Sequence, residues 1–350
     1  MTWRTWIGMG VGTLGAGILL LAYGPGSLDA WRFDPAPPSP VLDSLFVNPA
    51  DATITEPGLR GAEDLEPGPD GRLYASLADG RIMARSPNGS WEEFARSGGR
   101  PLGMAFSPDG TLFVADALEG LLRLESDSDW TVLAEAGDPP ALRFPDDVTV
   151  GADGTIYLTD ASERYGYGDV GRSFWEGEQT GRLLAFPPDG SRRVVAEGLA
   201  FANGVAVDRR SGFVYVAETW AAAVHVYDPA SGDWRVLIDG LPGYPDNVHW
   251  DGEAGLLWIA MPARRIPLAE SLHRRPFLKR LAWRAAGIVR DAELEPSPVM
   301  ALAVDASGKP VRALYGVSNQ PAGITIAVPW EEQVWVAGVD RQGIEAFEPR

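Results

Sequence analysis

The fold is decided by a repeated stretch whose clearest copy reads DVTVGADGTIYLTD, from Asp147 to Asp160. An alternating apolar segment, a Gly-containing turn and an aromatic-bearing segment follow one another, as in two antiparallel strands joined by a tight hairpin. Related copies recur at intervals of about 40 residues. They read DLEPGPDGRLYAS from Asp64, GMAFSPDGTLFVAD from Gly103, GVAVDRRSGFVYVAE from Gly204 and NVHWDGEAGLLWIAM from Asn247, and a sixth, GITIAVPWEEQVWVAG from Gly323, lacks the glycine turn.

Each unit continues into a third apolar stretch, such as GRIMARS, GLLRLE, GRLLAF or AVHVYD. Four-stranded sheets repeated around an axis predict an all-β fold, a six-bladed β-propeller over residues 53–350. A ring of blades closes when a strand from one end of the chain completes the blade at the other end. The candidates are TITEPGL at 53–59 and GIEAF at 343–347. The alternative is a degenerate seventh blade hidden in the uneven spacing.

Composition supports this interpretation and excludes several functions. Among 350 residues there are 41 Gly, 29 Pro and 13 Trp, which is typical of a turn-rich and strand-rich protein. The net charge of -18 argues against a nucleic-acid partner, because such binding depends on basic side chains that neutralise phosphates. The absence of cysteine excludes disulfides, thiolate catalysis and Cys-based zinc sites.

The N-terminus carries the strongest apolar signal in the chain. No charge occurs from Thr5 to Tyr23, and a helix of roughly 20 such residues crosses a bilayer. Residues 1–24 therefore predict a membrane anchor. Arg4 before it places the N-terminus in the cytoplasm and the propeller on the other side, periplasmic, lumenal or extracellular. The alternative is a cleaved signal peptide and a secreted protein, although no small-x-small cleavage site closes the stretch. Residues 25–52 predict a linker, stiffened by prolines.

A basic insertion at 262–298 interrupts the fifth repeat. Its charged residues are Arg264, Arg265, Arg274, Arg275, Lys279, Arg280, Arg284 and Arg290. Apolar residues lie between them, which predicts helices. The main interpretation is a helical lid over one tunnel mouth, and the alternative is an interfacial helix on anionic lipid.

A second regularity lies eleven or twelve residues before the second-strand aromatic of each repeat. This position carries Glu63, Leu102, Asp146, Asn203 and the pair Asp246-Asn247. Equivalent positions start the innermost strands at one height beside the axis, so their side chains should converge. Carboxylates gathered in a narrow tunnel either take up protons or require a cation. The alternative is that these residues only form turns at strand entries.

Ligands that are all oxygen atoms predict a hard cation. The number of donors suits Ca²⁺, which takes six to eight oxygens, better than octahedral Mg²⁺, while zinc and manganese remain open. The neighbouring Asp64 and Asp147 repeat at one offset and predict a second, deeper carboxylate pair.

The run from Leu199 to Ala260, with GLAFANGVAV, VYVAET and GLPGYPDNV, resembles the strictosidine-synthase-like family, as do FPDDVTV, IYLTDASERYG and TGRLLAF upstream. This family includes adipocyte plasma-membrane-associated proteins and is related to paraoxonases and gluconolactonases. The resemblance covers nearly all of the chain after about residue 55. It implies a catalytic calcium whose ligands match Glu63, Asn203, Asp246 and Asn247, with Asp146 where the family usually has Asn. It also implies that Asp64 and Asp147 hold a second, structural calcium, as in paraoxonases.

Two departures from the related families limit the mechanism. Leu102 stands where paraoxonases carry a histidine, which argues against histidine-based hydrolysis. The catalytic glutamate of true strictosidine synthases aligns near Thr325, which argues against condensation of an amine with an aldehyde. Asp146 adds a negative charge that should tighten calcium binding and weaken its Lewis acidity.

These inferences predict a calcium-dependent hydrolase of esters or lactones, of the lactonase or arylesterase type, acting on a small molecule. Asp246 would be the base or nucleophile, with Glu63 beside it in the catalytic set. The expected tunnel lining comprises His249, Leu102, Trp175 and Trp220. The main alternative is a non-enzymatic, membrane-tethered binding propeller with structural calcium, and a strictosidine-synthase-type condensation is the less favoured one.

Overall fold

The computed structural model describes residues 22–24, 26–87, 89–126, 129–137, 141–285, 298–318, 320 and 323–348. The chain divides into two compact units. The first comprises Met1–Asp34, Gly171–Glu178 and Ile266–Glu295, and the second comprises Pro35–Val170, Gln179–Arg265 and Pro296–Arg350.

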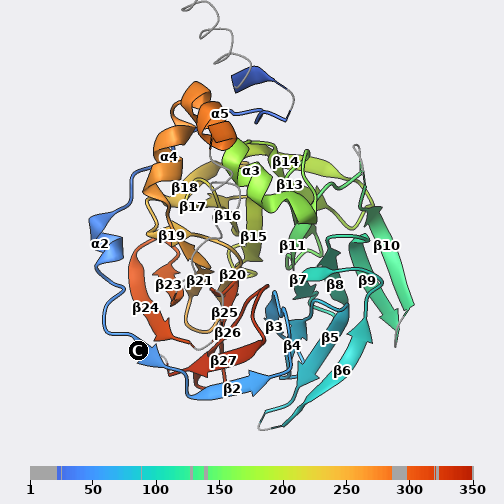
Figure 1. The fold of residues 1–350 in the computed structure, drawn as a ribbon. Helices are drawn as coiled ribbons and strands as arrows, with labels where there is room; N and C mark the ends of the chain where they lie inside the picture. The colour runs from blue at the N-terminus through green and yellow to red at the C-terminus, as the bar shows by residue number, and fades with distance from the viewer. Residues whose placement is uncertain are drawn as a thin grey trace, which may run out of the picture. The chain divides into compact units, whose positions relative to one another are not determined.

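The second unit is a six-bladed β-propeller, as the repeats predict, and its sheets surround a central axis (Figure 1). Blades 1 to 3, from the inner to the outer strand, are β3 (Leu65–Pro67), β4 (Leu73–Ser76), β5 (Arg81–Arg85), β6 (Trp91–Arg96); β7 (Pro101–Phe106), β8 (Leu112–Asp116), β9 (Gly120–Ser126), β10 (Asp129–Glu135); β11 (Pro145–Val150), β12 (Ile156–Asp160), β13 (Gly181–Phe186), β14 (Arg193–Leu199). Blades 4 to 6 are β15 (Ala202–Val207), β16 (Val214–Glu218), β17 (Ala223–Tyr227), β18 (Trp234–Ile238); β20 (Val248–Asp251), β21 (Leu256–Ala260), β23 (Val299–Asp305), β24 (Pro310–Val317); β25 (Ile326–Trp330), β26 (Gln333–Ala337), β27 (Gly343–Phe347), β2 (Ile54–Pro57).

The two ends of the chain close the ring at blade 6. Strand β2 pairs antiparallel with β27, with Ile54 opposite Ala346, which confirms both strands predicted for closure. A short β1 (Ala50–Asp51) adds to the outer edge of blade 5. The remaining elements of this unit are α2 (Pro40–Asp43), the 3-10 turn η1 (Tyr167–Asp169) and the ribbon of β19 (Gly243–Tyr244) with β22 (Ala263–Arg264).

The hairpin after each inner strand explains the glycine of the repeat. In blades 2 and 3 the turn places Gly110 at φ 89° and Gly154 at φ 81°, a left-handed region that only glycine enters at no cost. In blade 6 the same turn is made by Glu331 at φ 48° and Glu332 at φ 61°. Each costs about 1–2 kcal/mol relative to glycine. The pairing of β25 with β26 is thus retained without the expected turn residue.

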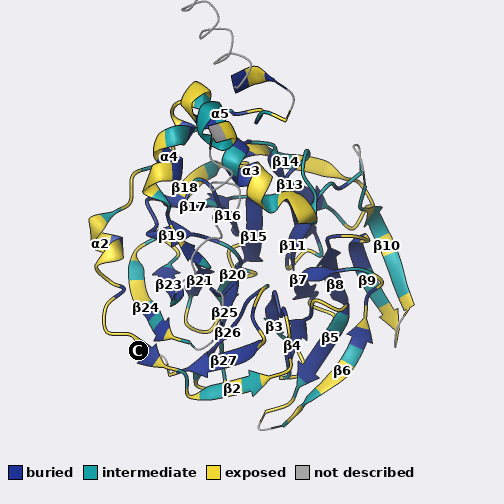
Figure 2. Cartoon of the chain, viewed as in Figure 1, coloured by how far each residue is buried: buried dark blue, intermediate teal, exposed yellow. Residues whose placement is uncertain are grey.

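The core of the propeller lies in the seams between blades. Each seam holds an apolar cluster, and in the one between blades 2 and 3 Phe113 packs near Leu158. The inner strands β7, β11 and β15 are buried along their whole lengths (Figure 2). Since each blade covers the faces of its neighbours, the starts of the inner strands are held rigidly around the axis.

The first unit contains α3 (Val170–Glu176) from residue 171 on, α4 (Pro267–His273) and α5 (Pro276–Ala285). The helices α4 and α5 lie in the chain between β21 and β23, which confirms a helical insertion in blade 5. Within the described ranges, no helix has the length and apolar character needed to cross a bilayer. The predicted anchor falls mainly on residues 1–21, which lie outside those ranges.

Candidate functional site

The structure brings together the five oxygen-bearing residues that the repeats predict. Asp146 and Asn203 belong to β11 and β15, and Glu63 and the pair Asp246-Asn247 come just before β3 and β20. The Asn247 side-chain amide donates a hydrogen bond of 2.8 Å to Glu63 Oε1. The Asn203 side chain hydrogen-bonds the Asp246 carboxylate. Four blades thus contribute to one polar cluster at the axis.

Burial raises the free-energy cost of negative charge on the carboxylates of this cluster. Glu63 and Asp146 are each only 4 % exposed, whereas Asp246 keeps partial exposure. Loss of water around Glu63 raises its pKa well above the usual range, and the Asp246 and Asp146 charges raise it further. Burial, and then the Asp246 and Asp160 charges, raise the pKa of Asp146, and burial raises that of Asp246 to about 7. Without a cation, these carboxylates resist ionisation together.

Orphaned oxygen atoms test whether this cluster fits a cation. Within the described part of the chain, the buried Glu63 Oε2, Asn203 Oδ1 and Asn247 Oδ1 have no hydrogen-bond donor. A buried acceptor without a donor costs free energy, which a cation would recover. Calcium binds amide and carboxylate oxygens, so these three atoms are suitable calcium ligands.

Binding of a cation by this cluster depends on the side chains of Asn203 and Asn247. Over the described residues, no three or more Asp, Glu or His side chains form a ready metal-binding group. The candidate set instead combines three carboxylates with two amides, and Asn247 donates to one Glu63 oxygen. While this hydrogen bond holds Glu63 Oε1, Glu63 Oε2 and Asn247 Oδ1 have no hydrogen-bond donor among the described residues and can bind the cation.

The carboxylates of Asp64 and Asp147 differ from those of the cluster, because they already accept hydrogen bonds from backbone N–H groups. Asp64 accepts hydrogen bonds from the amides of Leu65 and Met104, each 2.8 Å long. Asp147 accepts them from Val148 at 2.7 Å and Val205 at 2.6 Å. Each carboxylate thus ties its own blade to the next one in the chain. The second calcium remains a prediction, for which only the remaining lone pairs of these oxygens are free.

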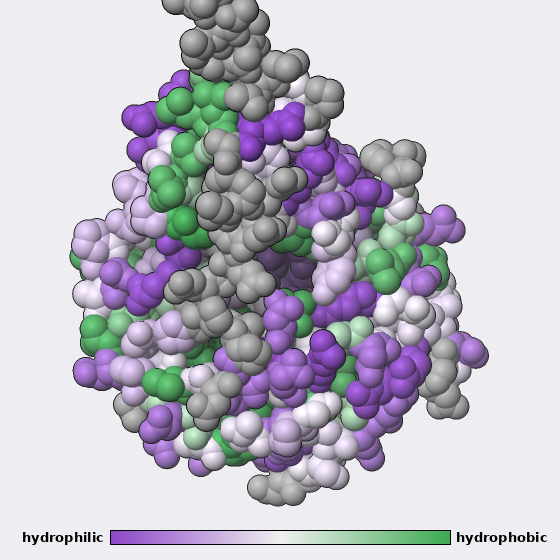
Figure 3. All heavy atoms as spheres, viewed as in Figure 1, coloured by the Kyte–Doolittle hydropathy of each residue, from purple (hydrophilic) through white to green (hydrophobic). Residues whose placement is uncertain are grey.

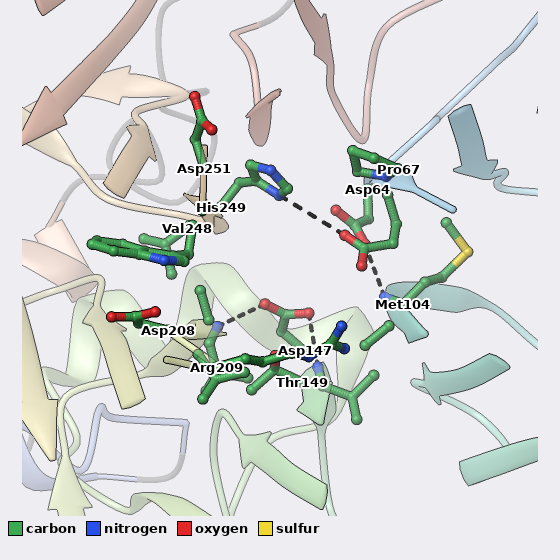
Figure 4. Close-up of a pocket in the computed structure, with 18 of the residues that line it drawn as sticks. Asp64, Pro67, Met104, Asp147, Thr149, Asp208, Arg209, Val248, His249 and Asp251 are labelled. Carbon is green, nitrogen blue, oxygen red and sulfur yellow. Dashed lines mark hydrogen bonds and ion pairs between the residues drawn. The ribbon is translucent and has the colours of Figure 1, made fainter. Parts of the chain in front are cut away.

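A cavity of about 470 Å³ extends along the axis from these two carboxylates to the hairpin turns at the far ends of the inner strands. Figure 4 shows Asp147 on one side of it and His249 on the other. His249 Nδ1 lies 3.8 Å from Glu66 Oε2. Burial lowers the pKa of His249 to about 4 and raises that of Glu66 to about 8, so both are neutral near pH 7. The five residues of the polar cluster, Glu63, Asp146, Asn203, Asp246 and Asn247, do not line this cavity.

The other predicted lining residues, Leu102, Trp175 and Trp220, are not among the residues that line this cavity. Leu102 is buried in β7 and gives blade 2 no oxygen donor from its side chain. Trp220 is buried against Phe201, with ring centroids 4.8 Å apart. Trp175 belongs to α3 in the first unit. Thr325 comes just before β25 of blade 6 and donates a 2.6 Å hydrogen bond to the Glu63 carbonyl oxygen.

Arg100 is a site residue that the repeat pattern does not identify. It is 4 % exposed, and its guanidinium donates to the carbonyl oxygens of Gly61 at 3.1 Å and Pro101 at 2.8 Å. Its charge lowers the pKa of Glu63 and of Asp146, against the effect of burial. The available signal was a charge two residues before the cluster position, where blades 1 and 3 have Gly61 and Phe144.

The equivalent position in blades 3 to 5 carries aromatic residues that form an arc. Successive ring centroids lie 4.8 to 6.0 Å apart along Tyr167, Phe144, Phe201, Trp220 and Tyr244. Phe201 adopts φ 68°, a left-handed conformation that costs a bulky residue about 1–2 kcal/mol. Packing in the arc maintains this strain two residues before Asn203, and the apolar surroundings explain the loss of water at the cluster.

Comparison with protein families gives two matches. Residues 70–266 match the family described as SMP-30/Gluconolactonase/LRE-like region. Residues 52–85 match the family described as Strictosidine synthase-like, N-terminal.

Curated relatives agree with both. Protein STRICTOSIDINE SYNTHASE-LIKE 6 of Arabidopsis thaliana is 37% identical over 62% of this chain and 60% of its own length, so the match spans less than two thirds of that relative. Protein STRICTOSIDINE SYNTHASE-LIKE 4 of the same plant is 32% identical over 84% of this chain and 81% of its own length. The adipocyte plasma membrane-associated protein of Rattus norvegicus is 30% identical over 71% of this chain and 72% of its own.

Solved structures share the fold. A gluconolactonase from Xanthomonas campestris superposes with a TM-score of 0.61 at 16% identity, over 93% of this chain and 97% of that chain. A luciferin-regenerating enzyme superposes with a TM-score of 0.57 at 14% identity, over 84% of this chain and 95% of that one.

Proposed function

Because the chain belongs to the strictosidine synthase-like family within the SMP-30/gluconolactonase superfamily, we propose that it is a calcium-dependent hydrolase of esters or lactones. The observation that carries this proposal is the buried cluster of oxygen donors at the propeller axis. Three of its oxygens lack a hydrogen-bond donor among the described residues. A cation would satisfy these oxygens and offset the repulsion between carboxylates.

Glu63, Asp146, Asn203, Asp246 and Asn247 would hold the ion. When bound, calcium supplies a Lewis acid that polarises a carbonyl oxygen and stabilises negative charge on it. The Asn203 side chain orients the Asp246 carboxylate through a hydrogen bond. Asp246 is the one member of this set with partial exposure, so it can reach a substrate. We assign it as the general base that accepts a proton from water, or as the nucleophile.

Two neighbouring positions restrict the reaction. Leu102 offers no side-chain group for proton transfer, so this position of blade 2 contributes no base to the cluster. Thr325 donates its hydroxyl hydrogen to the Glu63 carbonyl oxygen and provides no acid or base from blade 6. Hydrolysis supported by Asp246 therefore fits better than condensation of an amine with an aldehyde.

A substrate panel with controlled calcium tests the proposal. Lactones, aryl esters and phosphotriesters are offered to the purified chain with calcium, with a chelator, and with chelator followed by excess calcium. We expect hydrolysis of at least one lactone or ester that the chelator removes and calcium restores. Hydrolysis that continues unchanged in chelator would contradict a calcium-dependent mechanism.

The same experiment separates the enzyme from a binding propeller, when thermal unfolding is recorded in parallel. If calcium raises the unfolding temperature while no substrate class is hydrolysed, the ion has a structural role. That outcome would favour a tethered propeller that binds a partner, and would leave the cation site intact while rejecting the hydrolase.

A further inference from the structure

The first unit carries an exposed amphipathic face on helix α5. Phe277 is 38% exposed and Leu278 is 43% exposed, and Leu281 and Arg284 follow at helical spacing on the same face. Figure 3 shows apolar side chains gathered over α4 and α5, with hydrophilic side chains on both sides. Leu268 on α4 is 71% exposed. Such a surface on an otherwise polar protein indicates an interaction site.

The segment that follows the apolar N-terminus is fastened to this helix. Tyr23 is 58% exposed, and its ring lies 6.3 Å from that of Phe277. The Arg280 guanidinium lies 5.0 Å above the Tyr23 ring and donates hydrogen bonds to the carbonyl oxygens of Leu28 at 3.1 Å and Ala30 at 3.2 Å. Tyr23 therefore cannot move far from α5 while these bonds hold.

A buried lysine strengthens this attachment. Lys279 is 1 % exposed, and its ammonium group donates to the carbonyl oxygens of Trp31 at 3.1 Å and Glu176 at 2.8 Å, and to His273 Nδ1 at 2.9 Å. One side chain thus joins the N-terminal segment to all three helices of the unit. In the sequence, the uncharged stretch Thr5–Tyr23 comes directly before the residues that make these bonds.

The net positive charge of α4 and α5 indicates which kind of surface these helices bind. From Pro267 to Ala285 there are five basic residues and one acidic residue, Glu270, in a chain whose net charge is -18. Arg274, Arg275 and Arg284 are exposed. Exposed arginines beside exposed aromatic and aliphatic side chains are typical of helices that lie on anionic lipid.

We propose that the exposed face of α5, with Tyr23 and Leu268, lies on the surface of an anionic lipid bilayer. An apolar, uncharged segment runs from Thr5 to Tyr23, and the Tyr23 ring lies 6.3 Å from that of Phe277. A segment that enters the bilayer immediately before Tyr23 therefore brings α5 to the headgroup region. The insertion is a second membrane contact, and the residues after the anchor do not form a free spacer.

The absence of cysteine allows a direct test in the full chain. Leu278→Cys is labelled with a polarity-sensitive fluorophore, and the chain is reconstituted into phosphatidylcholine vesicles that contain phosphatidylserine. We expect quenching of the label by nitroxide-bearing lipid and protection from aqueous iodide. The matched control is Val311→Cys, on the exposed side of β24 at 51% exposure, whose label should respond to iodide alone.

Charge is tested on the same labelled protein. Neutralising one basic residue near a membrane weakens attraction about fivefold. Arg275→Gln should therefore increase iodide access to the Leu278→Cys label about fivefold in anionic vesicles, and have little effect in phosphatidylcholine alone. Arg235→Gln, at an exposed position of β18, is the control and should leave access unchanged.

Two outcomes would overturn the proposal. The first is iodide quenching at Leu278→Cys that equals quenching at Val311→Cys in anionic vesicles. The second is protection of the Leu278→Cys label that rises with protein-to-lipid ratio and produces energy transfer between labelled chains, since a second copy of the chain would then cover the face. Neither outcome depends on whether the propeller hydrolyses an ester.

Discussion

Asp246 differs from the four other oxygen-bearing residues of the cluster because it is partly exposed. Asn203 fixes its orientation, and the surrounding protein raises its pKa to about 7. A carboxylate with these properties can exchange protons near neutral pH, provided that one oxygen stays free of the ion.

Replacing Asp246 with Asn tests this role. Asp246→Asn keeps the size and an oxygen ligand but removes the base, so we expect turnover to fall about a thousandfold in a protein that, without calcium, melts no lower than the parent chain. Asp233→Asn, an exposed turn residue, is the control and should keep full activity. The measurement is kcat/KM on a substrate identified by the panel, and undiminished hydrolysis would remove Asp246 from the mechanism.

Asp146 tests the electrostatics of the same cluster. Asp146→Asn removes a buried like charge, so the calcium-free protein should become more stable while calcium affinity falls on the order of tenfold to a hundredfold. Calorimetric titration and thermal unfolding without calcium measure the two effects. Equal affinity in both proteins would mean that Asp146 does not face the ion.

The residues of the cluster were predictable because each repeats at one position of a periodic sequence. Arg100 was not, because its effect on Glu63 depends on a contact between blades. The strained φ of Phe201 was equally hidden, since nothing in the local sequence marks a phenylalanine for a left-handed conformation. Such features come from packing, which a single strand does not encode.

At the scale of elements, the approach of β15 to β20 sets the geometry of the Asn203 and Asp246 pair. A Cβ atom at Gly204 would lie 2.5 Å from Asn247 Cα and 2.5 Å from the Val248 nitrogen, both of them backbone atoms. Gly204→Ala should therefore destabilise the protein by about 1–3 kcal/mol and weaken calcium binding. Gly168→Ala, with no atom within 4 Å of the new Cβ, should be neutral in the same urea titration.

The helices of the first unit should respond to acid through His273. Burial, and the Lys279 charge, lower the pKa of His273 to about 3, so the folded unit keeps it neutral. The unfolded chain gains a proton below about pH 6.5, whereas the folded unit does not. This part of the stability is therefore complete above pH 6.5 and declines as the pH falls toward 3, by about 2 kcal/mol at pH 5.

Hydrogen exchange in residues 266–285 at pH 7 and pH 5, corrected for the intrinsic rate, measures this loss. His273→Asn offers an amide oxygen to Lys279 and has no proton to gain, so its protection should not depend on pH in this range. Equal pH dependence in both proteins would assign the effect to another group.

The strands could be predicted from the sequence, whereas the contacts of the N-terminal segment could not. Alternating strands and Gly turns are local signals, and they identified every blade and the closing strands β2 and β27. The bonds of the linker segment 25–52 to α5 were not predicted, because its prolines suggest a spacer and its partners lie about 250 residues away.

At the scale of the whole molecule, stability depends on closure of the ring at blade 6. Strand β27 pairs with both β26 and β2, and Ile344 and Phe347 are fully buried. A chain that ends after Gln342 should lose cooperative unfolding, and its melting temperature should fall by about 10 °C or more. A chain that ends after Glu348 should melt like the full chain. Equal melting of the two would mean that closure adds little.

The hydrogen bonds of Asp64 and Asp147 group the six blades into three doublets. Asp64 ties blade 1 to blade 2, and Asp147 ties blade 3 to blade 4. At the equivalent place the backbone N–H of Asn247 donates a hydrogen bond to the Thr325 carbonyl oxygen and joins blade 5 to blade 6. A circularly permuted chain that is opened between doublets keeps the two blades of every doublet next to each other in the sequence. A chain that is opened within a doublet places those two blades at opposite ends of the sequence, so their hydrogen bond must then form between the two ends of the chain.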